Sequence, residues 1–137
     1  MTTQQFKIFD KYDLSGIQIQ DRGLKPVINF EPKLILKSHG RNVQKFGQIK
    51  VNVVERLMNK LAVAGHRGKK HKIQKKSTGK YTRNMKIVLE AFELIENKTG
   101  KNPVEILAKA IENSEPRDEI TAIEYGGARY PQAVDVS

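Results

Sequence analysis

The stretch Asn102-Pro-Val-Glu-Ile-Leu-Ala-Lys-Ala-Ile111 carries the strongest helix-start signal in the sequence. Asn102 can accept hydrogen bonds from the open backbone amides of a first turn, and Pro103 stands where no amide hydrogen is needed. Glu105 can reach back to the cap and favours the positive end of the helix dipole. Pro116 ends the element. The sequence therefore predicts a helix from 102 with an apolar face formed by Ile106, Leu107, Ala110 and Ile111.

Two more amphipathic helices are predicted upstream, over about 52–64 and 82–98. Asn52 can cap the first of these helices, Gly65 can end it, and Gly100 can end the second. Their apolar stripes follow three-and-four spacing. The stripes are Val54, Leu57, Met58 and Leu61 in the first helix, and Met85, Val88, Leu89, Phe92 and Ile95 in the second. With roughly 1.5–3 kcal/mol for each buried apolar side chain, three such helices form a small core.

Residues 119–136 are typical of a β-hairpin. Gly126-Gly127 can form a two-residue turn with positive φ. In that register Tyr125 faces Ala128, Glu124 faces Arg129, and Ile123 faces Tyr130. One face would then display Tyr125 and Tyr130. Because a two-stranded ribbon is marginally stable alone, we expect it to pack on the helices or on a partner.

The first 50 residues predict an extended arm with short strands that lies over other elements or over a ligand. Ile17 and Ile19 alternate with glutamines, which is a weak strand signal, and Leu34-Ile-Leu36 is a second candidate strand. We therefore predict a mainly α fold. It consists of an arm over 1–50 and a small helical domain with a protruding β-hairpin over 51–137.

Positive charge is concentrated in one part of the chain. Between Lys33 and Lys86 there are sixteen lysines or arginines and one acidic residue, Glu55. Residues 1–32 hold four basic and four acidic groups, and residues 87–137 hold five basic and ten acidic groups, within a net charge of +10. A localised basic field is the footprint of a polyanion binder, and at this density of charge we predict that the polyanion is nucleic acid. Lysine exceeds arginine eighteen to seven, which favours backbone contacts over bidentate base recognition.

The basic stretch 65–80 contains three glycines and one apolar residue, Ile73. It can bury little, so we expect a partner to order it. Its glycines let the backbone approach phosphates closely, and its lysines act as point charges on them.

Catalytic and metal-binding patterns are absent from the sequence. There is no cysteine, no P-loop, and no apolar run long enough to span a membrane. His39, His66 and His71 lack a carboxylate or thiol cluster, so RNA contact or solvation fits them better than a metal. We predict no cofactor and no enzymatic activity.

Other interpretations remain open at this point. Tyrosines on a strand usually pack, and stacking on an unpaired base is the functional alternative for Tyr125 and Tyr130. A three-helix DNA-binding regulator is disfavoured because the second and third helices carry glutamates that a phosphate backbone would repel. An RNA-processing enzyme would need a nucleophile, a metal site or a cofactor loop, and none is present.

Several segments in order resemble ribosomal protein seven of the small subunit. They include Asn102-Pro-Val-Glu, Glu115-Pro-Arg-Asp-Glu-Ile120 and Tyr125-Gly-Gly-Ala-Arg-Tyr-Pro-Gln-Ala-Val-Asp-Val-Ser137. Upstream, Ser38-His-Gly-Arg-Asn42, Lys50–Leu61 and Met85–Ile95 continue the resemblance. The arm and the end of the basic loop resemble the archaeal and eukaryotic-cytoplasmic branch of that family.

The resemblance implies a ribosomal protein in the cytoplasm that binds the 3′ major domain of small-subunit rRNA and nucleates assembly of the head. It also implies a position near the E-site tRNA and the mRNA exit, beside small-subunit proteins nine and eleven. The RNA surfaces carried over are the arm, the basic loop and the ribbon. The residues expected to contact RNA are Lys33, Lys37, Arg41, Lys45, Lys50, Arg67, Lys69, Lys70, Lys72, Lys75, Lys76, Lys80, Arg83, Arg117, Tyr125, Gly126, Gly127, Arg129 and Tyr130.

One departure concerns the end of the chain. Family members continue past the ribbon with further helices that complete the fold and help to meet protein eleven, whereas this sequence stops at Ser137. We expect a truncated gene, an engineered fragment or part of a longer native chain.

Overall fold

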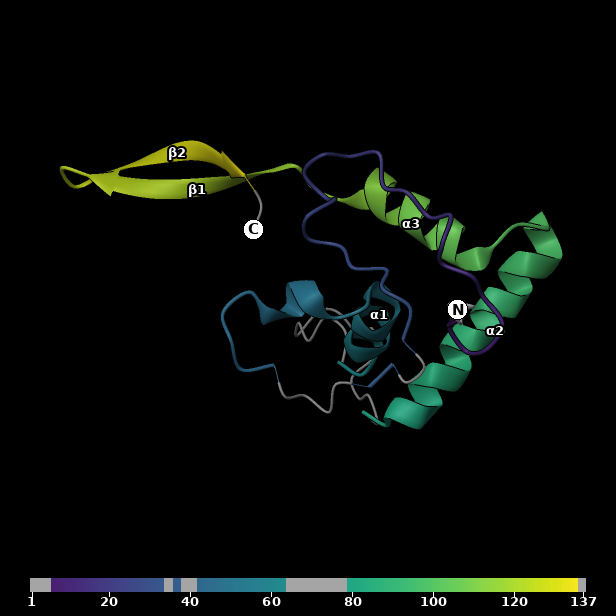
Figure 1. Cartoon of the computed structure of the whole chain (residues 1–137). Coiled ribbons are helices and arrows are strands. Elements are labelled where there is room, and N and C mark those ends of the chain that lie inside the picture. Colours follow the sequence, from purple (N-terminus) through teal and green to yellow (C-terminus); the bar gives the residue numbers. More distant parts are fainter. Residues whose placement is uncertain (1–5, 34–35, 38–41, 64–78, 136–137) are drawn as a thin grey trace, which may run out of the picture.

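The computed structural model describes residues 6–33, 36–37, 42–63 and 79–135. Within these residues it contains three α-helices, one short 3₁₀ helix and one antiparallel hairpin (Figure 1). The predicted fold class, mainly α with a protruding hairpin, is confirmed. In chain order the elements are η1 (Gly47–Lys50), α1 (Val53–Leu61), α2 (Tyr81–Thr99), α3 (Pro103–Ser114), β1 (Asp118–Tyr125) and β2 (Ala128–Asp135).

The predicted helix caps are confirmed. The Asn52 side chain accepts a hydrogen bond of 2.9 Å from the Val54 amide at the start of α1. The Asn102 side chain accepts one of 3.1 Å from the Val104 amide at the start of α3. Gly100 ends α2 in the left-handed conformation, with φ 66°, which suits glycine because it has no Cβ. The predicted stop at Gly65 lies outside the described residues.

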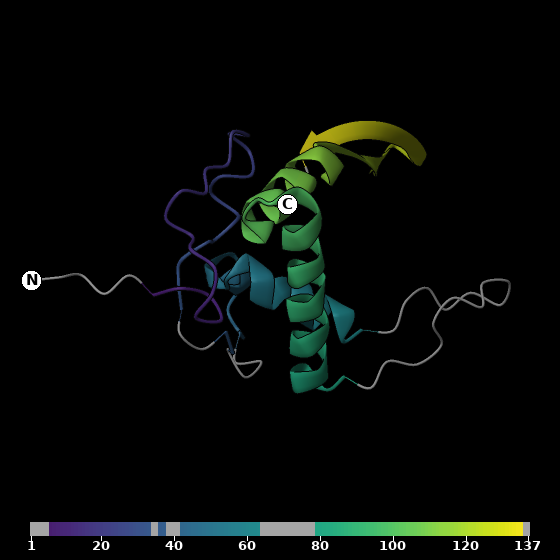
Figure 2. The ribbon, with the colours of Figure 1, turned by 90° about the vertical axis from the view of Figure 1, so that its right-hand side faces the viewer.

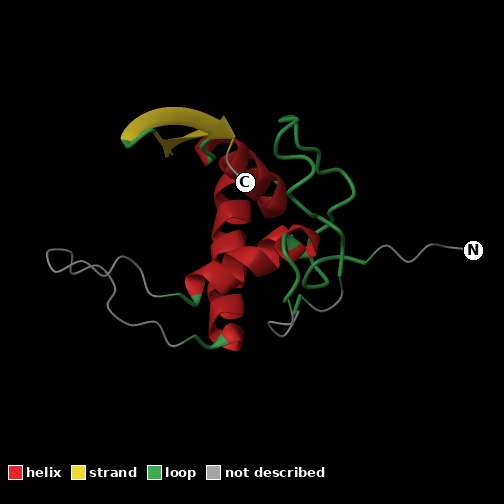
Figure 3. Ribbon diagram, turned by 90° about the vertical axis from the view of Figure 1, so that its left-hand side faces the viewer, coloured by secondary structure: helices red, strands yellow, loops and turns green. Residues whose placement is uncertain are grey.

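The helices pack through α2, which contacts both α1 and α3. Figure 3 shows α1 crossing α2, and Figure 1 shows α3 turning back across the other end of α2. The predicted stripes of α1 and α2 supply deeply buried side chains, while Leu61 at the end of α1 is 40% exposed. The face of α3 is shifted from the prediction: its buried apolar side chains are Pro103, Val104 and Ala108, and Ala110 is exposed. Residues 104, 107, 108 and 111 form a stripe with helical spacing that already includes the first turn.

The N-terminal segment belongs to the same core as the helices (Figure 2). Its buried side chains are Ile8, Tyr12, Leu14, Leu24 and Leu36. The ring of Tyr12 meets that of Phe92 edge-on, with 5.7 Å between their centroids. The segment therefore adds a layer of apolar side chains to the helical core.

The prediction of short strands in this segment is wrong for the described residues. Residues 17–20 form no strand, Leu36 lies in none, and Leu34 and Ile35 lie outside the described residues. Instead, isolated bridges join Ile8 to Tyr12 and Asn29 to Asn52. The physical reason is a contact with a distant helix: the backbone amide of Gln20 donates to the carboxylate of Glu112 on α3, so a neighbouring strand is not its partner.

Both helix-capping asparagines also hold the N-terminal segment. The amide nitrogen of Asn52 donates to the Glu31 carbonyl at 2.8 Å, and that of Asn102 donates to the Asp13 carbonyl at 2.6 Å. Each asparagine therefore uses its oxygen for a helix and its nitrogen for the segment. A residue with only one of these groups could not do both.

The hairpin has the predicted register. Tyr125 pairs with Ala128, Glu124 with Arg129, and Ile123 with Tyr130. Gly126 and Gly127 have φ of 60° and 79°, as a two-residue turn requires. The ribbon projects away from the helices (Figure 1), and the side chains of β1 are all exposed. Of the two expected supports for the ribbon, the helices and a partner, the helices are not the one used in the described part of the molecule.

Candidate nucleic-acid interface

The basic stretch occupies the arm, η1, α1 and the first half of α2. The described lysines and arginines of the predicted contact set are all exposed here: Lys33, Lys37, Lys45, Lys50, Lys80 and Arg83. Seven others, Arg41, Arg67, Lys69, Lys70, Lys72, Lys75 and Lys76, lie outside the described residues. Three ion pairs occur in the described part of the chain, and none uses a cation between Lys33 and Lys86. Water therefore surrounds these charges where a polyanion could replace it.

Helix α2 has opposite charge at its two ends. Lys80, Arg83 and Lys86 lie at its start, whereas its second half carries glutamates at 90, 93 and 96. Its first turn contains no acidic residue. Since the helix dipole favours acidic groups at the amino end by about 0.3–1 kcal/mol each, this arrangement costs stability. An anion bound at that end would recover the cost.

The acidic side chains, in contrast, serve the fold. Glu93 on α2 forms an ion pair of 2.7 Å with Lys11 in the arm. Its hydrogen bond and charge raise the pKa of the Lys11 ammonium. Glu112 on α3 accepts from the backbone amides of Gln20 at 2.5 Å and Asp21 at 3.3 Å. Two of the glutamates that the sequence places on the second and third helices therefore hold the arm.

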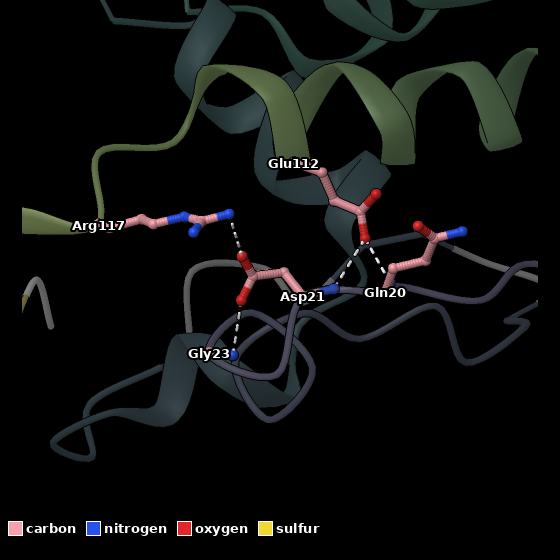
Figure 4. A network of polar contacts seen from close by, with 5 residues as sticks. All are labelled: Gln20, Asp21, Gly23, Glu112 and Arg117. Carbon is pink, nitrogen blue, oxygen red and sulfur yellow. Dashed lines mark hydrogen bonds and ion pairs between the residues drawn. The ribbon is translucent and has the colours of Figure 1, made fainter.

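Asp21 links the arm to the base of the hairpin. Its carboxylate forms an ion pair with Arg117 at 3.1 Å and accepts from the Gly23 amide at 2.7 Å (Figure 4). Burial and the nearby Asp21 carboxylate raise the pKa of the Glu115 carboxyl. Arg117, which the sequence assigned to RNA contact, is therefore already paired inside the molecule. Its side chain is still 78% exposed, so the pair leaves most of the guanidinium accessible.

The hairpin displays an aromatic and aliphatic face. The observed register puts Ile123, Tyr125, Tyr130 and Val134 on one side of the ribbon, and each is well exposed. Arg129 lies on the other side and forms an ion pair of 2.8 Å with Glu124, as the cross-strand pairing predicted. In the described residues the two tyrosines are therefore not packed into the protein interior, as the first interpretation would require.

A groove of about 960 Å³ separates the arm, α1, α3 and the hairpin base. Leucines 24, 57 and 107 line it, and Arg56, Lys60 and Arg117 add positive charge. The described residues of its lining include no histidine, serine, threonine or tyrosine. Nor does the described part of the chain hold a cluster of three acidic or histidine side chains that could bind a metal. Its acidic lining residues are Asp21, Glu115 and Asp118, of which Asp21 is paired with Arg117.

Sequence reasoning missed one exposed aromatic residue in this region. Phe46 precedes η1 and is 63% exposed, and the Lys45 ammonium lies 5.5 Å from its ring centroid. The sequence feature that could have revealed it is an aromatic residue beside a lysine, in a segment where no regular element was predicted.

No helix in the part of the chain that the structure covers combines the length and apolarity of a membrane span.

The fold and its surface define a small helical protein with a basic central stretch and a protruding ribbon. Comparison with known proteins gives the family. The family model described as ribosomal protein S7p/S5e matches residues 29–137. The chain belongs to this family of ribosomal proteins, whose members have structural and not catalytic roles.

Three archaeal relatives fit the branch that the resemblance indicated. Small ribosomal subunit protein uS7 of Nanoarchaeum equitans is 46% identical over 135 residues, which cover 97% of this chain and 68% of the relative. The same protein of Archaeoglobus fulgidus is 43% identical, with 99% of this chain and 66% of the relative covered. That of Methanothermobacter thermautotrophicus is 41% identical, with 95% and 65% covered. The chain therefore spans about two thirds of the length of these relatives.

Proposed function

We propose that this chain is a structural component of the small ribosomal subunit that binds ribosomal RNA. The observation that carries the proposal is the division of its charges. Acidic side chains on α2 and α3 hold the arm, whereas the described exposed cations Lys33, Lys37, Lys45, Lys50, Lys80 and Arg83 form none of the ion pairs found among the described residues. Its family and its archaeal relatives, which are named as small-subunit proteins, agree with this role.

The finer part of the proposal concerns the place of the protein in the ribosome. It binds the 3′ major domain of small-subunit rRNA and nucleates assembly of the head. The hairpin lies near the E-site tRNA and the mRNA exit, and small-subunit proteins nine and eleven are neighbours. The division into an arm over 1–50 and a helical domain over 51–137, and the full set of RNA-contacting residues, belong to the same proposal.

The physical basis of binding is neutralisation of phosphates. Each phosphate contact releases condensed counterions and contributes roughly 0.7–0.9 to the slope of log affinity against log salt. The start of α2, whose N-cap residue Lys80 makes no side-chain cap bond, adds its dipole to the charges of Lys80 and Arg83. The projecting ribbon suits a different contact, because its tyrosines are free to stack on unpaired bases.

A binding experiment tests the proposal. The 137-residue chain is titrated with a 3′ major-domain rRNA fragment, with a scrambled RNA and with duplex DNA over a salt series, and circular dichroism verifies its helix content. We expect a preference for the cognate fragment that persists at physiological salt. Equal binding to all three nucleic acids by a folded sample, abolished by salt, would refute a specific ribosomal role.

A further inference from the structure

Phe46 combines two unfavourable features. Its backbone is left-handed, with φ 59°, and its side chain is 63% exposed. A bulky residue with positive φ is a genuine outlier, and such strain concentrates at functional positions. Phe9 also has a positive φ, of 55°, but its side chain packs against the hydrophobic core. Core packing offsets the strain at Phe9, whereas Phe46 has no such compensation in the described molecule.

The charge around Phe46 suits a nucleotide. The Lys45 ammonium lies 5.5 Å from its ring centroid, and Lys50 ends the 3₁₀ helix that follows. No acidic residue occurs between Lys33 and Lys50 in the sequence. Lys37 and Tyr81 show the same ammonium-to-ring distance, but the Tyr81 ring is partly buried and its hydroxyl donates to the Leu36 carbonyl. Of these two pairs, only the pair at Phe46 presents a largely exposed ring.

The backbone holds Phe46 in place. The Phe46 carbonyl accepts from the Ile49 amide at 3.2 Å, and the Gly47 amide donates to the Gln44 carbonyl at 3.0 Å. At the end of η1, the Asn29 side chain donates to the Lys50 carbonyl at 2.9 Å and so ties η1 to an earlier part of the arm. An aromatic ring on a fixed support loses little conformational freedom on binding, which favours stacking.

We propose that Phe46 stacks on an unpaired base of RNA, while Lys45 binds a phosphate of the same strand. The ligand class is a single-stranded or looped-out nucleotide, because a ring can lie against the face of a base only where that face is unstacked. This inference rests on the proposed RNA-binding function and assigns one specific contact within it. Phe46 is thereby added to the residues expected from the sequence to contact RNA, which in residues 42–50 were only Lys45 and Lys50.

Affinity measurements separate stacking from charge. Phe46→Ala and Phe46→Leu are expected to weaken binding to the 3′ major-domain fragment by roughly 5- to 150-fold without changing the salt slope. Phe46→Tyr should retain the affinity, because it keeps the ring. Lys45→Gln should instead reduce the slope by about one. The matched control is Val43→Ala, which truncates a side chain that is 93% exposed on the same segment and should have no effect.

A fluorescence experiment gives a second measurement. The chain contains no tryptophan, so Phe46→Trp introduces a single reporter, and Val43→Trp is its control. We expect RNA to quench the tryptophan at 46 strongly and the one at 43 weakly. Wild-type affinity in Phe46→Ala, or equal quenching at both positions, would overturn the stacking contact while the wild-type chain still prefers the cognate RNA. Loss of that preference in the wild-type chain would overturn the proposed function and this contact together.

Discussion

The arm and the hairpin reverse the usual relation between regular structure and stability. The arm has no helix of more than one turn and no strand in its described residues, yet Ile8, Leu14 and Leu36 lie in the core. The hairpin is regular over its full length, yet all the side chains of β1 are exposed. The arm therefore stabilises the fold, whereas the side chains of the hairpin remain available to a ligand.

The largest expected effect comes from the same substitution placed in each region. Ile8→Ala removes a side chain that is 0% exposed, and it should lower the free energy of unfolding by about 2–5 kcal/mol. Ile120→Ala on the hairpin, at 76% exposure, should change it by less than about 0.5 kcal/mol. Urea denaturation followed by circular dichroism measures both. Equal losses would erase the distinction between arm and hairpin.

Next in size is the loss of RNA affinity on removing the aromatic face of the hairpin. Tyr125→Ala with Tyr130→Ala should weaken RNA binding by about 1–3 kcal/mol for each stacked base and leave the unfolding free energy almost unchanged. Filter binding and denaturation of the same sample test this. The pair Tyr125→Phe with Tyr130→Phe is the control, since it keeps both rings. A large loss of stability in the alanine variant would mean that the tyrosines support the fold.

The links between arm and helices should matter less than the core. Asn102→Ala removes both the cap of α3 and the hydrogen bond to the Asp13 carbonyl. It should lower the free energy of unfolding by at least the roughly 0.5–2 kcal/mol that the loss of a cap costs. Asn102→Ser keeps a capping oxygen without adding a charge but lacks the amide donor, so its cost approximates that of the bond to the arm. Thermal unfolding of the two variants provides the measurement. Identical stability of Asn102→Ser and wild type would show that this bond contributes nothing.

The smallest effect concerns the two ends of α2. Arg83→Glu should raise the free energy of unfolding by about 0.3–1 kcal/mol, because the dipole favours an acid there, yet weaken RNA binding. Lys98→Glu, in the last turn, makes the same change in net charge and should lower stability by a similar amount with little effect on affinity. Both are measured by denaturation and by titration with RNA. If the two variants lose the same affinity, net charge matters and position does not.

The elements with local signals were predictable from the sequence. Asn52 and Asn102 capped the predicted helices, and Gly126-Gly127 set the register that brings Glu124 to Arg129. These depend on residues within a few positions of one another. The family and the location of the basic surface likewise follow from ordered motifs and from charge counts along the chain.

The contacts of the arm were not predictable in this way. Asn102 binds the carbonyl of Asp13, and Glu112 binds the amide of Gln20, across some ninety residues of sequence. No periodicity marks such pairs, so the arm was interpreted as short strands, and whether it lay over other elements or over a ligand stayed open. The pairing of Arg117 with Asp21 was missed for the same reason. Phe46 was missed because its exposure and positive φ are properties of the folded backbone.

Hydrogen exchange with and without the 3′ major-domain RNA tests the central claim most directly. In the free protein, amides around Ile8 and Tyr12 should already exchange slowly, because they belong to the core. On binding, new protection should appear in residues 42–50, at the start of α2 and along the hairpin, and not in the half of α2 that carries glutamates. Protection confined to that acidic half and to α3, with none on the basic segment or the hairpin, would contradict the account.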